Sequence, residues 1–455
     1  MSGPRRSHER EEREERTAPS RAPALGDARS ASEGSPQLED RRVSLNGYLL
    51  LGVCTLLLGS GFEDARIEVG GLLVHPYLVL IALLLPFVTL PKLGRIPPLI
   101  ATWMGAFLIL YFVIALRDPS GFGECLKISA AFATFLTAAF LTKSRADFRA
   151  AGTVLCLVAA VFAVRGMIQI ENDLVGATEM LDIGGKNAYS LLALPGLLLG
   201  GAVALDRQAG PWSRAFATLG AICITAGLFA TGNRSGWLGV LVAAFLLAAR
   251  GRSVRAVVVL GVFAVAVYWV LTELSSTAAF ERRWNLTLEG YGSDETRWEL
   301  FLTALEIGLE NPVLGASPDG VHSELPRRLD LSFGMIDTHN VFGYIVGGFG
   351  LITTTAFFAL GYSLWRRHRA VPSESAHVLL RYLLILWVVR GSFSREVLYA
   401  PAFFIAFGVV FGLCLREGVW RVPEKSSRPA HPRGLEKRAA HAPAIRATSS
   451  AKSGP

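Results

Sequence analysis

The sequence predicts an all-α polytopic membrane protein with about twelve transmembrane helices and one long outward-facing loop. Three observations support this fold class. The 455-residue chain is 51% hydrophobic with a mean hydropathy of +0.41, which is too apolar for an ordinary soluble protein of this length. The apolar residues form runs of roughly 17–23 residues, the length that crosses a bilayer. Basic residues collect in alternate connections between these runs, as the positive-inside rule describes.

The apolar runs define the predicted spans one by one. The run over 214–250 is nearly continuous, and we divide it at 231–236, Thr-Gly-Asn-Arg-Ser-Gly, where small and polar residues predict a tight turn. The resulting spans are 45–62, 72–90, 97–116, 125–142, 150–170, 188–205, 214–231, 234–250, 254–272, 340–364, 376–392 and 398–416.

Two sets of connections alternate along the chain and differ in their basic residues. The poorer set has only one or two per short connection, such as Arg66 and Arg117. The positive-inside rule places the richer set and both charged tails in the cytoplasm and the loop over 273–339 outside. The richer set comprises Lys92 and Arg95; Lys143, Arg145 and Arg149; Arg207 and Arg214; Arg250, Arg252 and Arg255; and Arg366, Arg367 and Arg369.

These boundaries predict five parts. We expect a disordered cytoplasmic tail over 1–43, a membrane bundle of nine spans over 44–272 and the outward loop over 273–339. A bundle of three spans follows over 340–416, and a second disordered tail occupies 417–455.

The outward loop is acidic and contains one predicted amphipathic helix, at about 294–310. Asp294 is expected to cap its N-terminus, and Asn311-Pro312 is expected to end it. Apolar residues recur at helical spacing on one face and glutamates occupy the other, so the helix should lie against the bundle or in the headgroup layer. The apolar face comprises Trp298, Leu302, Leu305 and Leu309, and the acidic face comprises Glu295, Glu299, Glu306 and Glu310.

Composition also excludes other kinds of protein. The net charge of +8 is compatible with a nucleic-acid binder, but the basic residues sit in short connections and in the tails, so we reject that interpretation. The five cysteines stand singly in apolar segments without metal or redox spacing. We therefore expect them to be small core residues, and we predict neither a metal nor a cofactor.

Arg234 is the first candidate functional residue. It begins the span over 234–250 and is followed by Ser235 and Gly236. An arginine at the hydrocarbon centre costs roughly 2.5–3.5 kcal/mol on insertion scales, so an arginine near a span is usually paired or functional. Snorkelling of the side chain to the headgroups is the competing explanation. The small neighbours leave room for an anionic group, and a guanidinium suits phosphate through its planar fork of donors.

Arg297 is the second candidate and lies in the first turn of the predicted loop helix. An ion pair with Asp294, Glu295 or Glu299 on the same helix is the competing explanation, and it is the stronger one for this residue taken alone.

His339 is the third candidate, in the segment Asp337-Thr-His-Asn340 at the start of the span over 340–364. Its ordinary pKa of about 6.5 suits a general base at neutral pH, and Asp337 could orient or charge it. The competing explanations are a hydrogen-bonded interfacial histidine and a helix cap supplied by Thr338 or Asn340.

Weaker candidates also lie on the outward side. Lys186 and Asn187 precede the sixth span, where they could meet a phosphate or a headgroup, and Asn340 is a further candidate for substrate binding. Arg390 and Arg395, near the eleventh and twelfth spans, are similar.

Three segments together resemble the O-antigen ligase and polymerase superfamily. The segment 230–239, Ala-Thr-Gly-Asn-Arg-Ser-Gly-Trp-Leu-Gly, resembles the Ser-Arg-Gly element of that family, with Asn233 where serine is common. The segment 295–315 is similar to the family's Arg-x-x-x-aromatic helix followed by Asn-Pro-Leu-x-Gly. The segment 338–351 is similar to its His-Asn element before a glycine-rich span. Order and spacing match over about 230–360, and the first half of the chain agrees mainly in hydropathy and span number.

The resemblance implies a glycan transferase of the bacterial inner membrane with a periplasmic active site. The donor would be a glycan on undecaprenyl diphosphate. The acceptor would be a lipid A–core hydroxyl in a ligase, or another lipid-linked repeat in a polymerase. Arg234 and Arg297 match the family's arginines and would hold the diphosphate, and His339 matches its catalytic histidine.

The implied chemistry agrees with the residue types. Two arginines can stabilise the negative charge that builds on a leaving diphosphate. His339 would accept the proton of the acceptor hydroxyl, or orient that hydroxyl, as it attacks the anomeric carbon. A single displacement would invert that centre, and no Asp-x-Asp pattern with a metal-ligand partner is evident in the outward loops. We therefore expect a metal-independent inverting transferase whose partners are membrane lipid and amphiphilic substrates.

Two alternatives stay open at this point. A polymerase shares the donor chemistry, and the single large outward loop favours a ligase over it. A transporter is less favoured, because transporters gather charges at the bilayer midplane and show repeated halves. Here the charges within spans are few (Lys127, Arg165, Arg381 and Arg390), and the polar candidates collect on the outward side.

Overall fold

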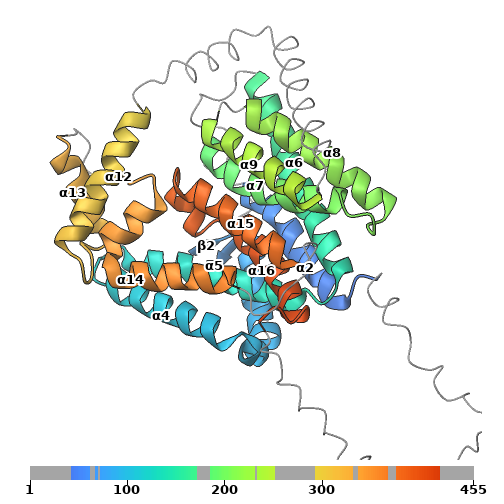
Figure 1. Ribbon diagram of the computed structural model, residues 1–455, viewed down its shortest axis with the longest axis horizontal. Coiled ribbons are helices and arrows are strands. Elements are labelled where there is room, and N and C mark those ends of the chain that lie inside the picture. The colour runs from blue at the N-terminus through green and yellow to red at the C-terminus, as the bar shows by residue number, and fades with distance from the viewer. Residues whose placement is uncertain are drawn as a thin grey trace, which may run out of the picture.

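The protein is a helical bundle in the computed structural model, which describes residues 42–61, 67–69, 72–171, 185–230, 233–251, 293–330, 337–366 and 376–420 (Figure 1). In chain order the described elements are α2 (Leu45–Leu56), η1 (Leu57–Gly61), β1 (Ile67–Val69), β2 (Leu72–Val74), α3 (Pro76–Leu84), η3 (Leu85–Thr89), η4 (Leu90–Arg95), α4 (Pro98–Ala115), α5 (Gly121–Leu141), α6 (Arg145–Glu171), α7 (Gly185–Ala204), α8 (Pro211–Ala230), α9 (Arg234–Gly251), α12 (Ser293–Glu310), α13 (Pro318–Arg328), α14 (Val341–Trp365), α15 (Ala376–Gly391), η5 (Arg395–Leu398) and α16 (Pro401–Arg416).

Helical segments coincide with every predicted span except 254–272, which lies outside the described residues. In the described part, 7 helices are long and apolar enough to cross a membrane, and three shorter apolar helices accompany them. The chain is therefore helical with several membrane-spanning helices. The count of twelve spans and the domain boundaries stay predictions.

The structure bears out the predicted helical fold class, with one short departure. Strands β1 and β2 form a short antiparallel hairpin with Val69 opposite Leu72. β-branched residues favour strands, and Ile67, Val69 and Val74 supply them here. As a result, the helix predicted from residue 72 begins only at Pro76. Pro86 and Pro91 then interrupt it, so it continues as the wider turn η3 and the tighter turn η4.

The bundle has two chemically different ends. One, called here the basic end, gathers connections of the predicted cytoplasmic set. Arg149 pairs with Asp206 at 2.8 Å, which joins the start of α6 to the end of α7. Ser44, before α2, donates to Asp147 at the start of α6. Trp420, after α16, donates to the carbonyl of Arg366 after α14. Arg145 on α6 pairs with Glu417 after α16 at 3.1 Å, so these contacts hold the two ends of the described chain at the same end of the bundle. The cytoplasmic placement of both tails stays a prediction.

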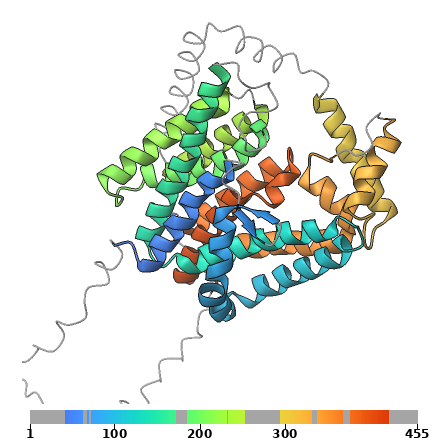
Figure 2. The ribbon, with the colours of Figure 1, turned by 180° about the vertical axis from the view of Figure 1, so that it is seen from behind.

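The opposite end, called here the site end, carries α12 and α13. Asp118 and Ser120, between α4 and α5, hydrogen-bond the backbone and the carboxylate of Asp319 at the start of α13. Figures 1 and 2 show α12 and α13 at one edge of the bundle, away from α8 and α9.

Helix α12 packs against α14, and the two run in the same direction. A Cβ atom on Gly343 would lie 3.3 Å from the Cβ of Ala304, and one on Gly347 would lie 2.7 Å from the Ala304 carbonyl oxygen. One on Gly308 would lie 2.6 Å from the carbonyl oxygen of Val346. Only glycine permits helix backbones to approach so closely, so this interface depends on small residues.

The apolar face predicted for α12 is not the face that packs against the bundle. Leu300, Ala304 and Ile307 are buried in the described structure, whereas Trp298 and Leu309 are 60% and 66% exposed. At its closest approach to α14 the helix presents the small residues Ala304 and Gly308. Trp298 and Leu309 face away from the protein. The helix also begins at Ser293, so Asp294 lies within it and is not its cap.

Helix α14 breaks at Gly350, which has φ +72° and ψ 179°. The segment that follows α12 fits into this break. Leu351 donates its N–H to Pro312 at 2.7 Å, and Ala316 donates its N–H to Gly347 at 2.9 Å. Gly315 also has a positive φ, and its Cβ would lie 2.4 Å from Gly348. Both glycines are therefore required by backbone conformation and by space.

We predict that Gly350→Ala destabilises the protein by about 1–3 kcal/mol, because a Cβ is strained at this φ and ψ and would lie 2.6 Å from the Gly315 nitrogen. Gly361→Ala on the same helix is the matched control, since nothing lies within 4 Å of a Cβ there. Thermal unfolding of the purified protein in detergent measures both. Equal midpoints for the two variants would contradict this account of the break.

Candidate functional site

The C-terminal end of α15 is the point where several predicted site segments meet. Arg390 is fully buried there. Its Nε donates to Ser190 at 2.9 Å, its Nη1 donates to Ser235 at 2.9 Å, and its Nη2 reaches the backbone and side-chain oxygens of Asn187 at 3.4 and 3.3 Å. One guanidinium thus ties α7 and α9 to α15, and each hydrogen bond offsets the cost of burying its charge.

The start of α9 is fixed by Ser235, which accepts from Arg390, and by Asn233. Asn233 precedes the helix, and its Oδ1 accepts from Ser235 Oγ at 2.7 Å and from the Gly236 N–H at 3.2 Å. These are the bonds of an N-cap, for which asparagine is as suitable as serine. Arg234 is the first residue of α9, and its side chain lies outside what the structure describes.

Two further predicted residues lie close to the end of α15. Asn340 donates from Nδ2 to the carbonyl oxygen of Ser392 at 3.0 Å. The half-buried Arg297 lies close enough to Arg390 for their charges to repel each other. Three groups therefore lie around residues 390–392. They are Ser235, which follows Arg234, Asn340, which follows His339, and the charged group of Arg297.

The packing of α12 on α14 supports the same juxtaposition. Arg297 precedes Phe301 by one turn, and His339 precedes Gly343 by four residues. A Cβ on Gly343 would lie 3.1 Å from the Phe301 ring. Because the helices run in the same direction, their N-terminal ends lie at the same end of the bundle.

His339 has φ +50°, a left-handed conformation that is uncommon outside glycine and that histidine adopts more readily than most residues. Its N–H donates to Asp337 Oδ1 at 3.3 Å. In the part of the chain that the structure describes, its imidazole forms no hydrogen bond or ion pair. Asp337 therefore holds the backbone of His339, and the ring stays available.

Asn340 serves as the N-cap of α14, as one of the competing explanations held. Its Oδ1 accepts from the N–H groups of Phe342 and Gly343 at 2.8 and 3.1 Å. Together with the bond to Ser392, these contacts engage both ends of its amide.

The ion pair proposed for Arg297 with Glu299 is not formed among the described side chains, while those of Asp294 and Glu295 lie outside the description. The side chain of Lys186 is not described either. Asn187 is engaged by Arg390 and by Asn233, whose Nδ2 lies 3.5 Å from its Oδ1.

A carboxylate surrounded by tyrosines, Glu124, was missed by the sequence analysis. Buried Glu124 accepts hydrogen bonds from Tyr111 and Tyr344 at 3.2 Å and also from Tyr399. Lys127 donates to its other oxygen at 3.0 Å. We call these five residues the Glu124 cluster. They come from α4, α5, α14 and the approach to α16, so no local sequence pattern joins them.

Arg395 links the Glu124 cluster to the His339 segment. Its guanidinium lies 4.9 Å from the centre of the Tyr344 ring, and its Nε lies 2.9 Å from Asp337 Oδ2. Its Nη1 donates to Nε2 of His322 on α13 at 2.6 Å. Arg395 therefore fixes the carboxylate that holds His339, a role that its weak sequence signal did not indicate.

His322 is neutral in this arrangement, because Nε2 must accept from Arg395. Its ring stacks on Tyr344 with centroids 5.8 Å apart. Burial lowers the pKa of His322 below its ordinary 6.5, the charge of Arg395 lowers it further, and Asp337 partly opposes both effects.

A cavity of about 340 Å³ opens beside Arg395. Its polar lining includes His75, Lys127, Arg395, Tyr399 and one carboxylate, Glu396, and Ala188, the neighbour of Asn187, also lines it. Leu57 of η1 and Leu191 and Leu192 of α7 supply part of its apolar lining. The cavity thus lies between the Glu124 cluster and the start of α7, and it combines cationic and apolar walls. No group of three or more metal-binding side chains is found in the described residues, and metal independence stays a prediction.

The family model described as O-Antigen ligase matches residues 219–358 of the chain. This range contains Arg234, Arg297 and His339 together with all three resembling segments, so the resemblance is confirmed. It ends before Arg390 and Arg395, and it begins after the Glu124 and Lys127 positions. None of the curated proteins compared with the chain matches it.

We predict that thermal stability falls as pH decreases from about 6.5. The folded pKa of His322 is below its ordinary value, so the unfolded chain binds the proton more readily and folding loses free energy over this window. His322→Gln should flatten the decline, and the thermal midpoint of detergent-solubilised protein between pH 7.5 and about 5 measures it. An equal decline in both proteins would exclude this role for His322.

Proposed function

We propose, from the premise that this chain belongs to the O-antigen ligase and polymerase superfamily through residues 219–358, that it transfers a glycan from undecaprenyl diphosphate to a hydroxyl of a lipid A–core acceptor. The observation that carries the proposal is the gathering of Ser235, Arg297 and Asn340 around residues 390–392. Ser235 follows Arg234 in the chain, and Asn340 follows His339.

The proposed step is a single displacement. The acceptor oxygen forms a bond to the anomeric carbon as the bond between that carbon and the diphosphate oxygen breaks. His339 takes the acceptor proton, and undecaprenyl diphosphate leaves with the bonding electron pair. Arg234 and Arg297 stabilise the charge that builds on the leaving diphosphate. This displacement inverts the anomeric centre.

Three features of the described residues support these roles. The His339 ring is free of partners in the described chain, so it can reach a hydroxyl. The left-handed backbone and the bond to Asp337 hold it in place, and Asp337 is in turn held by Arg395. The cavity beside Arg395 combines two cations, Lys127 and Arg395, with one carboxylate, Glu396, and an apolar wall, so its cations can meet the phosphates of a lipid diphosphate.

We place the reaction at the site end of the bundle, which the positive-inside rule assigns to the periplasmic face of the inner membrane. Both substrates are amphiphiles, and a site at the membrane surface admits both.

His339→Ala should lower transfer by about 10²–10⁴-fold, the range for loss of a general base. Arg297→Ala should also lower it strongly, because a charge-stabilising group is lost. The assay follows labelled glycan from lipid diphosphate to acceptor with purified protein and no energy source. Arg327→Ala, at an exposed arginine of α13 that pairs only with Glu324 among described residues, is the control and should retain activity.

Near-normal transfer by the His339 variant would remove it from the catalytic role. Surface glycan from a deletion strain separates the two acceptors. Loss of capped core with intact lipid-linked polymer supports the ligase, whereas single-repeat glycan supports a polymerase instead.

A further inference from the structure

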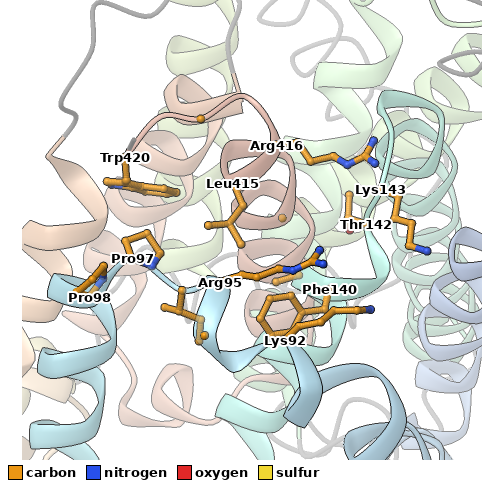
Figure 3. Close-up of a pocket in the computed structure, with 15 residues that line it drawn as sticks. Lys92, Arg95, Pro97, Pro98, Phe140, Thr142, Lys143, Leu415, Arg416 and Trp420 are labelled. Carbon is orange, nitrogen blue, oxygen red and sulfur yellow. The ribbon is translucent and has the colours of Figure 1, made fainter. Parts of the chain in front are cut away.

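A large pocket lies at the basic end of the bundle, opposite the candidate site (Figure 3). Its volume is about 840 Å³. Among the described residues, four cationic side chains and no carboxylate line it; the four are Lys92, Arg95, Lys143 and Arg416. The proposed function makes no use of this pocket.

Helices α4, α5 and α16 each run between the basic end and the site end of the bundle. The start of α5 supplies Glu124 to the site end, and the chain after its last residue reaches the pocket at Thr142 and Lys143. A 21-residue helix is about 32 Å long at 1.5 Å per residue. The pocket is therefore about one hydrocarbon thickness from the site, at the level of the opposite headgroups.

The four cations lack the partners that nearby charges have. In the described part of the chain none of them forms an ion pair, whereas adjacent Arg145 pairs with Glu417 at 3.1 Å. The charges of Lys143 and Arg95 act unfavourably on Lys92. The C-terminal ends of α5 and α16 supply about half a negative charge each, which compensates only part of four positive charges.

The pocket is also amphipathic. Figure 3 shows the nitrogen-bearing ends of Lys92, Arg95, Lys143 and Arg416 on one side, with Trp420, Leu415, Pro97 and Pro98 on the other. Trp420 is held rigidly, because its Nε1 donates to the Arg366 carbonyl at 3.0 Å and its ring packs on Phe411. An occupant with phosphates beside apolar chains matches both sides.

We propose that this pocket binds the headgroup of an anionic phospholipid, with a two-phosphate headgroup bound more tightly than a one-phosphate headgroup. Basic pockets between membrane helices on the cytoplasmic side recognise such headgroups. Two phosphodiester charges and two helix ends together offset most of the charge of the four cations. This inference is independent of the proposed function.

The test uses the full-length protein purified in neutral detergent and measures its thermal midpoint against added diphosphatidylglycerol, phosphatidylglycerol, phosphatidylcholine or inorganic phosphate. The pocket variant combines Lys143→Gln with Arg416→Gln. The matched control combines Arg207→Gln with Arg214→Gln, which removes the same charge at the same end from exposed residues outside the pocket.

Diphosphatidylglycerol should raise the midpoint of wild type and control at the lowest concentration, with phosphatidylglycerol next. The pocket variant should need about 30-fold more lipid, from about a fivefold loss for each cation removed. An equal response of pocket and control variants would overturn the proposal. So would an equal effect of phosphatidylcholine, or of inorganic phosphate, which would assign the pocket to a soluble anion. The midpoint without lipid shows whether each variant is folded.

Discussion

The contact between α12 and α14 is the constraint on which the candidate site depends. Gly308 on one helix and Gly343 and Gly347 on the other let two backbones meet without intervening side chains. The break at Gly350 then receives the segment that follows α12. Since lipid offers no hydrophobic driving force between helices, van der Waals packing of this kind has to hold them together. The result is a fixed position for Arg297 relative to the chain that carries His339.

Two arginines, Arg390 and Arg395, also hold the candidate residues in position. Arg390 and Arg395 lie on either side of a short turn, and each distributes its hydrogen bonds or ion pairs over several helices. An unpaired charge at such depth would be expensive, so these groups hold their neighbours in specific positions. Arg390 fixes the start of α9 next to Arg234, and Arg395 fixes Asp337 next to His339. The candidate residues are thus positioned by arginines outside the matched family range.

Hydropathy predicted most of the helical segments, because a helix that crosses a bilayer needs an uninterrupted run of about 20 apolar residues, which is visible in the sequence. It failed where local chemistry overrode it, at the β1–β2 hairpin and at the packed face of α12. There the small residues Ala304 and Gly308 decided the packing, and Trp298 and Leu309 stayed exposed.

The sequence also indicated the His339 segment and the arginines, but it could not indicate Glu124, Tyr344 or His322 as one group. Their contacts join residues separated by as many as 275 positions, as between Glu124 and Tyr399. Such contacts leave no local pattern.

The shared direction of α12 and α14 is the central claim, and a disulfide tests it most directly. In Ala304→Cys/Gly343→Cys the two Cβ atoms would lie about 3.3 Å apart, near the spacing of a disulfide. The account predicts rapid cross-linking on oxidation, and no cross-link in Ala304→Cys/Gly361→Cys. Failure of the first pair to cross-link, or efficient cross-linking of the second, would contradict the arrangement that brings Arg297 and His339 to one site.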